Sequence, residues 1–213
     1  MMMLLSGLVG LLLVLTAEAR VGYGAGLGVC SETEQCLLFD LVCKTENFEV
    51  RYYEPAKWAA TVGTGSSVGI ALVNGVNQLH EYFNGANENG EKFHMPEHVG
   101  ITVPNETIWE TSAYAVIALL PLEYQETSPP TPTVDNVYIY DAVESTMYVR
   151  SFDGLLTAKS DRDAAQSLAR DLDSVGAKYD KSFYFVATFA SRMSLIDRRS
   201  EVLFVALDEP VCI

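Results

Sequence analysis

Histidine and basic residues are scarce in this 213-residue chain. It has three histidines, the first His80 and the last His98, and 14 Lys and Arg against 28 Asp and Glu, a formal net charge of −14 at pH 7. Because phosphate binding depends on clustered Lys and Arg, nucleic acid is excluded as an expected partner. There is no G-x-S-x-G elbow and no H-E-x-x-H motif, and a Ser-His-Asp set would have to recruit one of three histidines. The sequence therefore predicts a binding protein and no enzyme.

A single long apolar run is present, and it lies at the N-terminus. Residues 1–19, MMMLLSGLVGLLLVLTAEA, are apolar from Met3 to Leu15 and end in the small-x-small pattern that signal peptidase recognises. The run is shorter than the roughly 20 residues of a membrane span. We expect residues 1–19 to be a signal peptide and the mature chain to be secreted without stable membrane insertion; an uncleaved anchor is the alternative.

Cysteines are few, and their number is even. Cys30, Cys36 and Cys43 crowd the mature N-terminus, and Cys212 is the penultimate residue. In a secreted chain this predicts two disulfide bonds, one of which ties the C-terminus to the N-terminal segment, although the pairing stays open. The spacing C-x5-C-x6-C lacks the close pairs of zinc sites. A glycosylation triplet begins at Asn105 and predicts an exposed loop.

The rest of the chain consists of two similar passes. Residues 20–45 form a glycine- and cysteine-rich arm that we expect to be stapled by disulfides, and residues 46–211 form the domain. Each pass predicts a two-strand hairpin, a helix with apolar residues at helical spacing, and two extended segments. In the first pass these are residues 48–62 with a turn at Glu54 and Pro55, 66–83, 92–103 and 112–125. In the second they are residues 137–154, 160–176, 181–190 and 200–210.

This repeated order predicts an α+β fold. Its two pseudo-symmetric β-hairpin/helix/two-strand halves would form a mainly antiparallel sheet or open barrel, with two helices on one side. The proline-rich loop 126–136 separates the halves, because proline cannot sit inside a sheet ladder. Ser66 or Ser67 is expected to cap the first helix, and Gly176 is expected to end the second.

Three segments of the chain resemble the SOUL haem-binding family. They are FEVRYYEPAKWAATV, PPTPTVDNVYIYDAVESTMYVRSFDG and SFYFVATFASRMSLIDRRSEVLFVALDEP, and the resemblance extends over about residues 48–210. It implies a distorted antiparallel barrel of two halves with two helices, and haem or a related tetrapyrrole as ligand in an apolar cleft beside the first helix. Members of this family are typically intracellular, whereas this chain has a leader, and the histidine proposed as iron ligand in one member corresponds to Tyr52 here.

The resemblance places the candidate haem cleft along the first helix. Val73, Val76, His80 and Phe83 share a face of that helix at spacings of three and four. The resemblance implies that these residues would line an apolar slot for the macrocycle. The alternative is that they are core residues, with His80 at the solvent rim.

Candidate iron ligands lie outside that helix as well. His94, Met95 and His98 form a close cluster, but His94 and His98 would lie about 13 Å apart on one face of a strand and need a bend to share an iron. The alternative is a solvated loop. Tyr52 is a candidate through its phenol oxygen, and since neighbouring strand residues point to opposite faces, we expect at most one of Tyr52 and Tyr53 to line a pocket.

The sequence thus predicts a secreted, non-enzymatic carrier or scavenger of haem or a related tetrapyrrole. The alternative is a secreted binding or defence protein for another apolar ligand or for a protein partner. Hydrolytic or tetrapyrrole-modifying activity is a third hypothesis. The oligomeric state is not predicted.

Overall fold

The computed structural model describes residues 21–22, 36–96, 98–105, 112–154, 156–157, 159–189 and 199–213. The predicted leader, Cys30, and most of the glycine-rich arm lie outside the described residues. The elements, in chain order, are β1 (Val21–Gly22), β2 (Cys36–Leu37), β3 (Asp40–Lys44), β4 (Glu49–Tyr53), β5 (Ala56–Gly65), α1 (Val68–Phe83), β6 (His98–Pro104), β7 (Ser112–Leu119), α2 (Leu122–Gln125), β8 (Tyr138–Ala142), β9 (Ser145–Asp153), α3 (Ser160–Ser174), β10 (Phe183–Phe189) and β11 (Arg199–Val205).

Both predicted helices form where the apolar spacing places them. The backbone N–H of Ile70 donates to the side chain of Ser67, which caps α1. α3 ends at Ser174, and Gly176 follows with a φ of 70°, the left-handed conformation that ends a helix. The short helix α2 was not predicted, because its four residues lie at the end of an apolar segment that reads as a strand.

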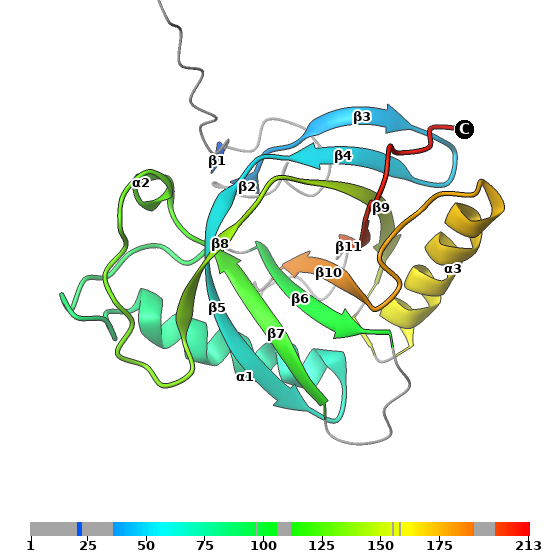
Figure 1. Cartoon of the computed structure of the whole chain (residues 1–213). Helices are drawn as coiled ribbons and strands as arrows, with labels where there is room; N and C mark the ends of the chain where they lie inside the picture. The colour runs from blue at the N-terminus through cyan, green and yellow to red at the C-terminus, as the bar shows by residue number, and fades with distance from the viewer. Residues whose placement is uncertain are drawn as a thin grey trace, which may run out of the picture.

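The sheet confirms the two pseudo-symmetric halves. Nine antiparallel strands lie in the order β3-β4-β9-β11-β10-β6-β7-β5-β8 (Figure 1). If β3 is left out, the first four strands counted from one end of the sheet correspond to the first four counted from the other end, with each strand replaced by its equivalent in the other half. The strands β4-β9-β11-β10 from one end correspond to β8-β5-β7-β6 from the other. The sheet is strongly curved and has two edges, β3 and β8, so it is not closed into the distorted barrel that the resemblance implies.

The predicted hairpins are wrong in their pairing. β4 pairs with β3 and β9, and β5 pairs with β7 and β8, so the two consecutive strands do not pair with each other, and neither do β8 and β9. Instead, β4 and β5 together run antiparallel to β8 and β9 in one register. Tyr53 lies opposite Ser145, and three residues further Ala56 lies opposite Ala142. Pro55, which has no N–H to donate, lies in the gap between the two ladders.

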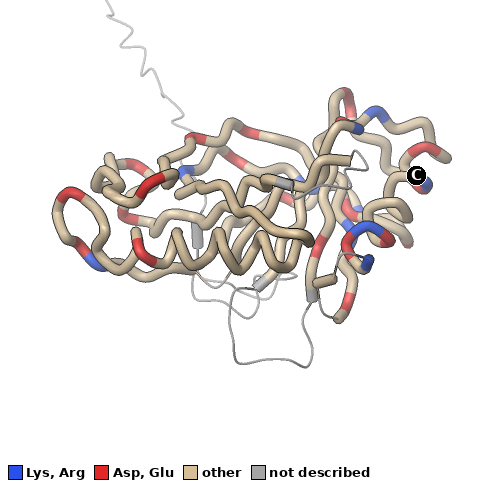
Figure 2. Tube along the Cα trace, turned by 90° about the horizontal axis from the view of Figure 1, so that it is seen from below, with Lys and Arg blue, Asp and Glu red and all other residues tan. Residues whose placement is uncertain are grey.

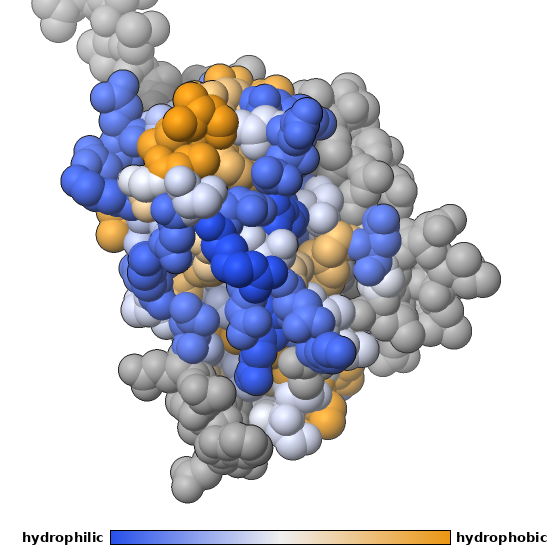
Figure 3. All heavy atoms as spheres, turned by 90° about the vertical axis from the view of Figure 1, so that its right-hand side faces the viewer, coloured by the Kyte–Doolittle hydropathy of each residue, from blue (hydrophilic) through white to orange (hydrophobic). Residues whose placement is uncertain are grey.

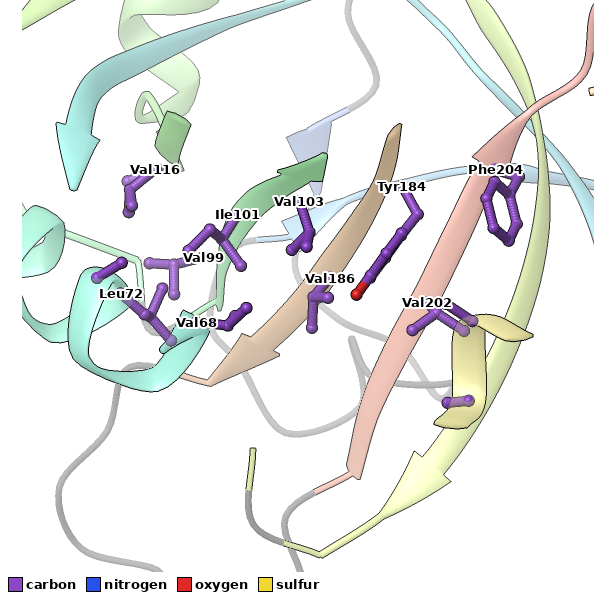
Figure 4. Packing of buried hydrophobic residues seen from close by; sticks show 14 of the residues in the cluster. Val68, Leu72, Val99, Ile101, Val103, Val116, Tyr184, Val186, Val202 and Phe204 are labelled. Carbon is purple, nitrogen blue, oxygen red and sulfur yellow. The ribbon is translucent and has the colours of Figure 1, made fainter. Parts of the chain in front are cut away.

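The main core lies between the sheet and the helices. Figure 4 shows Val99, Ile101 and Val103 of β6 on the same side of the sheet as buried residues of β10 and β11 and of α1. α1 lies very close to the sheet, since a Cβ atom on Gly75 would come within 2.6 Å of the Cβ of Val116. A larger residue has no room at this position.

The C-terminal segment lies beside β3 and β4 (Figure 1). A disulfide bond joins Cys43 of β3 to Cys212, which confirms the predicted tie between the two ends of the mature chain. Cys36 is disulfide-bonded too. The part of the expected arm that contains Cys43 is therefore an edge strand of the sheet, because β3 pairs with β4.

The surface is polar and acidic overall. The sequence has 28 Asp and Glu against 14 Lys and Arg, and Figure 2 shows acidic residues in many parts of the described trace. The face that carries α3 is predominantly hydrophilic, with apolar atoms gathered near its upper edge (Figure 3). Within the described ranges, no helix has the length and apolar character needed to cross a membrane.

Candidate functional site

The strands in the middle of the sheet are apolar on both faces. On β10, Tyr184 belongs to the core beneath the helices, whereas Phe183, Phe185 and Ala187 alternate with it and face the other way. α1 and α3 cover one face of the strongly curved sheet (Figure 1), and the opposite face is its inner face. Apolar side chains on the inner face therefore line a cavity.

This central cavity has a volume of about 600 Å³, within the range of small-molecule sites. Strands of both halves contribute to it. Its apolar and aromatic lining residues are Leu37, Phe39, Tyr52, Tyr53, Ala56, Trp58, Ile117, Tyr140, Ala142, Val143, Met147, Phe183, Phe185, Val186, Ala187, Leu203, Val205, Ala206 and Leu207. Val143 and Leu207 are 74% and 65% exposed, so apolar side chains also lie at the rim of the cavity.

A buried ion pair joins the two halves at the wall of the central cavity. Arg51 donates from Nη1 and Nη2 to the two carboxylate oxygens of Glu201, at 2.8 and 2.9 Å. Its Nε and Nη2 also donate to Glu49 Oε2, and its Nη1 donates to the Tyr53 hydroxyl at 3.4 Å. The ring of Phe39 lies against the guanidinium, 4.2 Å from centroid to Cζ. All five N–H groups of Arg51 are therefore used.

The protonation states in this cluster follow from burial and charge. Burial alone would lower the pKa of Arg51, but the hydrogen bonds and charges of Glu201 and Tyr53 raise it above its ordinary value. Burial raises the pKa of Tyr53 to about 12. At neutral pH the guanidinium stays charged and the phenol stays protonated. Neither Arg51 nor Tyr53 is therefore ready to exchange a proton at neutral pH.

His98 lines the same cavity from the start of β6. Burial lowers the pKa of His98 below its ordinary value, the charge of Arg51 acts in the same direction, and the charge of Glu201 opposes both. The imidazole is therefore neutral at neutral pH, which is the form that can bind a metal.

Of the residues that the sequence singles out, Tyr52 and His98 both line the central cavity. Tyr53 lines the cavity too, which corrects the expectation that only one of the two tyrosines would do so. The reason is that β4 ends at Tyr53 and its ladder is interrupted there, so strict alternation of faces no longer holds.

The residues predicted along the first helix do not line this cavity. Val73 is 57% exposed, and His80 is exposed with its ring nitrogens beside the Asn84 amide. Phe83 is buried in the core, and Val76 packs against it. Of the four predicted residues of α1, two are therefore exposed to solvent and two belong to the core.

The predicted ligand cluster is divided as well. His94 is exposed in the segment before β6, Met95 packs against the core, and His98 faces the central cavity. In the part of the chain that the structure describes, no group of three or more His, Cys, Asp and Glu is arranged to hold a metal ion. Asn105 is exposed, and its Nδ2 donates to the Lys181 carbonyl at 3.0 Å.

The sequence did not single out Glu201. One signal was available: Arg51 and Glu201 are residues of opposite charge that lie in two mainly apolar strand segments, FEVRYY and SEVLFV. Opposite charges placed inside two buried strands indicate a buried pair, because an isolated charge there would be too costly.

Comparisons with known proteins agree with this fold. Residues 34–205 match the model of the family described as SOUL heme-binding protein. Heme-binding protein 2 of Homo sapiens is 32% identical over 165 residues, which cover 77% of this chain and 80% of that protein, and Heme-binding protein 2 of Mus musculus is 30% identical over the same shares.

Two solved structures share the fold at low identity. A hydrolase from Listeria innocua has a TM-score of 0.52 at 12% identity and covers 78% of this chain and 94% of its own. The EcmrR C-terminal domain has a TM-score of 0.53 at 10% identity and covers 82% and 99%. At these identities the likeness concerns the fold alone.

Proposed function

Since this chain belongs to the SOUL heme-binding protein family, we propose that it binds haem or a related tetrapyrrole in the central cavity, without chemical turnover. The observation that carries the proposal is the second apolar face of the sheet. It encloses about 600 Å³, and in the described part of the chain α1 and α3 pack on the opposite face. A flat apolar ligand would bury that face.

The lining residues fit a tetrapyrrole in two respects. The walls offer aromatic rings, among them Trp58, Phe183 and Phe185, against which a planar macrocycle can pack. His98 and Tyr52 supply side chains of the types that ligate haem iron. Bound haem would supply an iron centre, and one of these two side chains would hold it. We propose His98 before Tyr52, because its imidazole is held neutral.

The Arg51 cluster supports binding and not hydrolysis. Glu201 accepts from both Arg51 and Ser151, and Tyr53 remains protonated at neutral pH. Both carboxylate oxygens of Glu201 are therefore occupied by donors from the protein itself. For this reason we propose that the cavity binds its ligand without hydrolysing it, although other proteins can use the same fold for catalysis.

We further propose that the protein is secreted and acts as a carrier or scavenger. The apolar N-terminal run and the Cys43–Cys212 bond support this, since disulfides persist in oxidising compartments. The exposed Asn105 is accessible for glycosylation. Mass spectrometry of the protein from culture medium tests the proposal, with an N-terminus at Arg20 and a sugar on Asn105 as the expected result. Retention of residues 1–19 would contradict it.

Titration of the purified protein with hemin tests the binding site. Ala142→Trp fills the central cavity from β8, and Val73→Asp places a charge on the exposed face of α1 as a matched control. We expect a Soret shift with the parent protein and with V73D, and its loss in A142W when circular dichroism shows that A142W is folded. Loss in V73D with retention in A142W would move the site to α1.

A second candidate is another apolar ligand in the same cavity, because the walls are apolar irrespective of any iron ligand. Binding of an apolar dye that A142W abolishes, together with no hemin binding by the parent protein, would favour this candidate.

A further inference from the structure

We propose that the central cavity selects against carboxylates on its ligand and favours a planar apolar ligand that is neutral or cationic and carries a hydrogen-bond donor. This inference rests on the proposed function and specifies the class of tetrapyrrole. It predicts that a tetrapyrrole with esterified carboxylates binds more tightly than the same molecule with free carboxylates.

The first observation is that the cation at the cavity has no donor left. Arg51 is the one Lys or Arg among the described residues that line the cavity. Its five N–H groups already donate to Glu201, Glu49 and Tyr53, and two carboxylates neutralise its charge. A carboxylate on a ligand would have to displace one of these buried bonds. Arg51 therefore cannot serve as a propionate-binding residue without a cost.

The second observation is the sign of the remaining charge. Glu54 and Glu144 lie on the two connections that cross the rim, and Asp208 lines the cavity from the C-terminal segment. Asp208 pairs with Lys178, but both side chains are more than half exposed, so the pair is weak. Glu144 and Asp208 are exposed, so solvent screens their charges, whereas Glu54 is only partly exposed. An anionic ligand group would therefore meet its strongest repulsion at Glu54, where like charges repel more strongly than in bulk water.

The third observation is an unsatisfied acceptor. Glu54 Oε2 is buried and has no hydrogen-bond partner within the residues that the structure describes. Buried polar atoms of native proteins nearly always have a partner. A ligand N–H, O–H or positive charge would supply it, whereas a carboxylate would add a second unsatisfied acceptor. Glu54 is therefore the positioning residue that we assign to the ligand's donor.

The test compares protoporphyrin IX with its dimethyl ester, titrated by porphyrin fluorescence in the same buffer and co-solvent. At low salt we expect the ester to bind about three- to tenfold more tightly, and we expect added salt to narrow the difference by strengthening only the binding of the diacid. Tighter or equal binding of the diacid, with binding that A142W abolishes, overturns the inference and leaves the proposed function intact.

Variants assign the effect to Glu54. Glu54→Gln keeps the shape of the side chain and removes its charge, and Glu81→Gln makes the same change at an exposed position of α1 outside the cavity lining. We expect E54Q to strengthen binding of the diacid by about threefold and E81Q to leave it unchanged. If E54Q and E81Q behave alike, the role assigned to Glu54 is wrong.

A failure of the proposed function gives a different result from a failure of the charge preference. If neither porphyrin binds, the tetrapyrrole proposal fails, and the charge preference is then judged with two apolar dyes, cationic acridine orange and anionic 8-anilinonaphthalene-1-sulfonate. Tighter binding of the cationic dye, abolished by A142W, supports the preference. Tighter binding of the anionic dye in the cavity overturns it.

Discussion

The buried pair between Arg51 and Glu201 predicts a specific pattern of stability changes. The side chains are 4% and 3% exposed. Arg51→Met removes both charged hydrogen bonds to Glu201 and leaves the Ser151 hydroxyl, 3.2 Å from Oε1, as its remaining side-chain donor in the described part of the chain. An uncompensated buried charge of this kind costs about 3–5 kcal/mol of unfolding free energy.

The double variant R51M/E201M separates the cost of breaking the pair from its net contribution. Because desolvation offsets much of the attraction between buried charges, replacing both partners with apolar side chains of similar size is expected to change stability by only about 1 kcal/mol. Of the two carboxylates that Arg51 binds, Glu49 loses less in R51M. Its side chain is 23% exposed, and it keeps an ion pair with Lys44 at 3.0 Å.

Urea unfolding at pH 7, with disulfides intact and followed by near-UV circular dichroism, measures both values. The variants must show the same dependence of unfolding free energy on urea concentration as the parent protein, so that the midpoints report stability. A loss below about 1 kcal/mol in R51M, or a double variant no more stable than R51M, would refute the assignment of a buried, fully compensated pair.

Three further predictions follow from burial and chain geometry. Cys43→Ser with Cys212→Ser opens a loop of 169 residues and should lower the unfolding free energy by about 2–5 kcal/mol in urea. Gly75→Ala should cost about 1–3 kcal/mol, despite better helix propensity, because its Cβ meets Val116; a more stable variant would contradict this. The folded state resists protonation of His98, so stability should fall as pH drops below about 6.5, and His98→Gln should flatten that part of the profile; an unchanged slope would contradict the depressed pKa.

The elements of the fold could be predicted because their signals are local. Helical spacing, a serine cap and Gly176 define α1 and α3, and alternation defines the strands. The partners of the strands could not be predicted, because alternation identifies a strand without identifying its neighbour. β4 and β5 are separated by two residues, and a hairpin is the usual interpretation of such spacing.

The site was only partly predictable for a related reason. Tyr52 was singled out by its position in the family resemblance and His98 by its chemistry, but their common location at the central cavity depends on the curvature of the sheet. The exposed Val73 and the buried Phe83 satisfy the helical pattern equally well, because a period of 3.6 gives the direction of a face and not what covers it. Apolar residues on both faces of β10 were the signal for a second buried surface.

The exchange of first strands between the halves links folding to binding. Arg51 belongs to the first half and Glu201 to the second, 150 residues apart, and the cavity that they border is lined by strands from both halves. Neither half alone encloses this space, since β4 and β8 each complete the sheet of the other half. A ligand in the cavity therefore binds only the assembled domain and should stabilise it against global unfolding by mass action. The increase in unfolding free energy with ligand concentration should then vanish in A142W, where the cavity is filled while the fold persists.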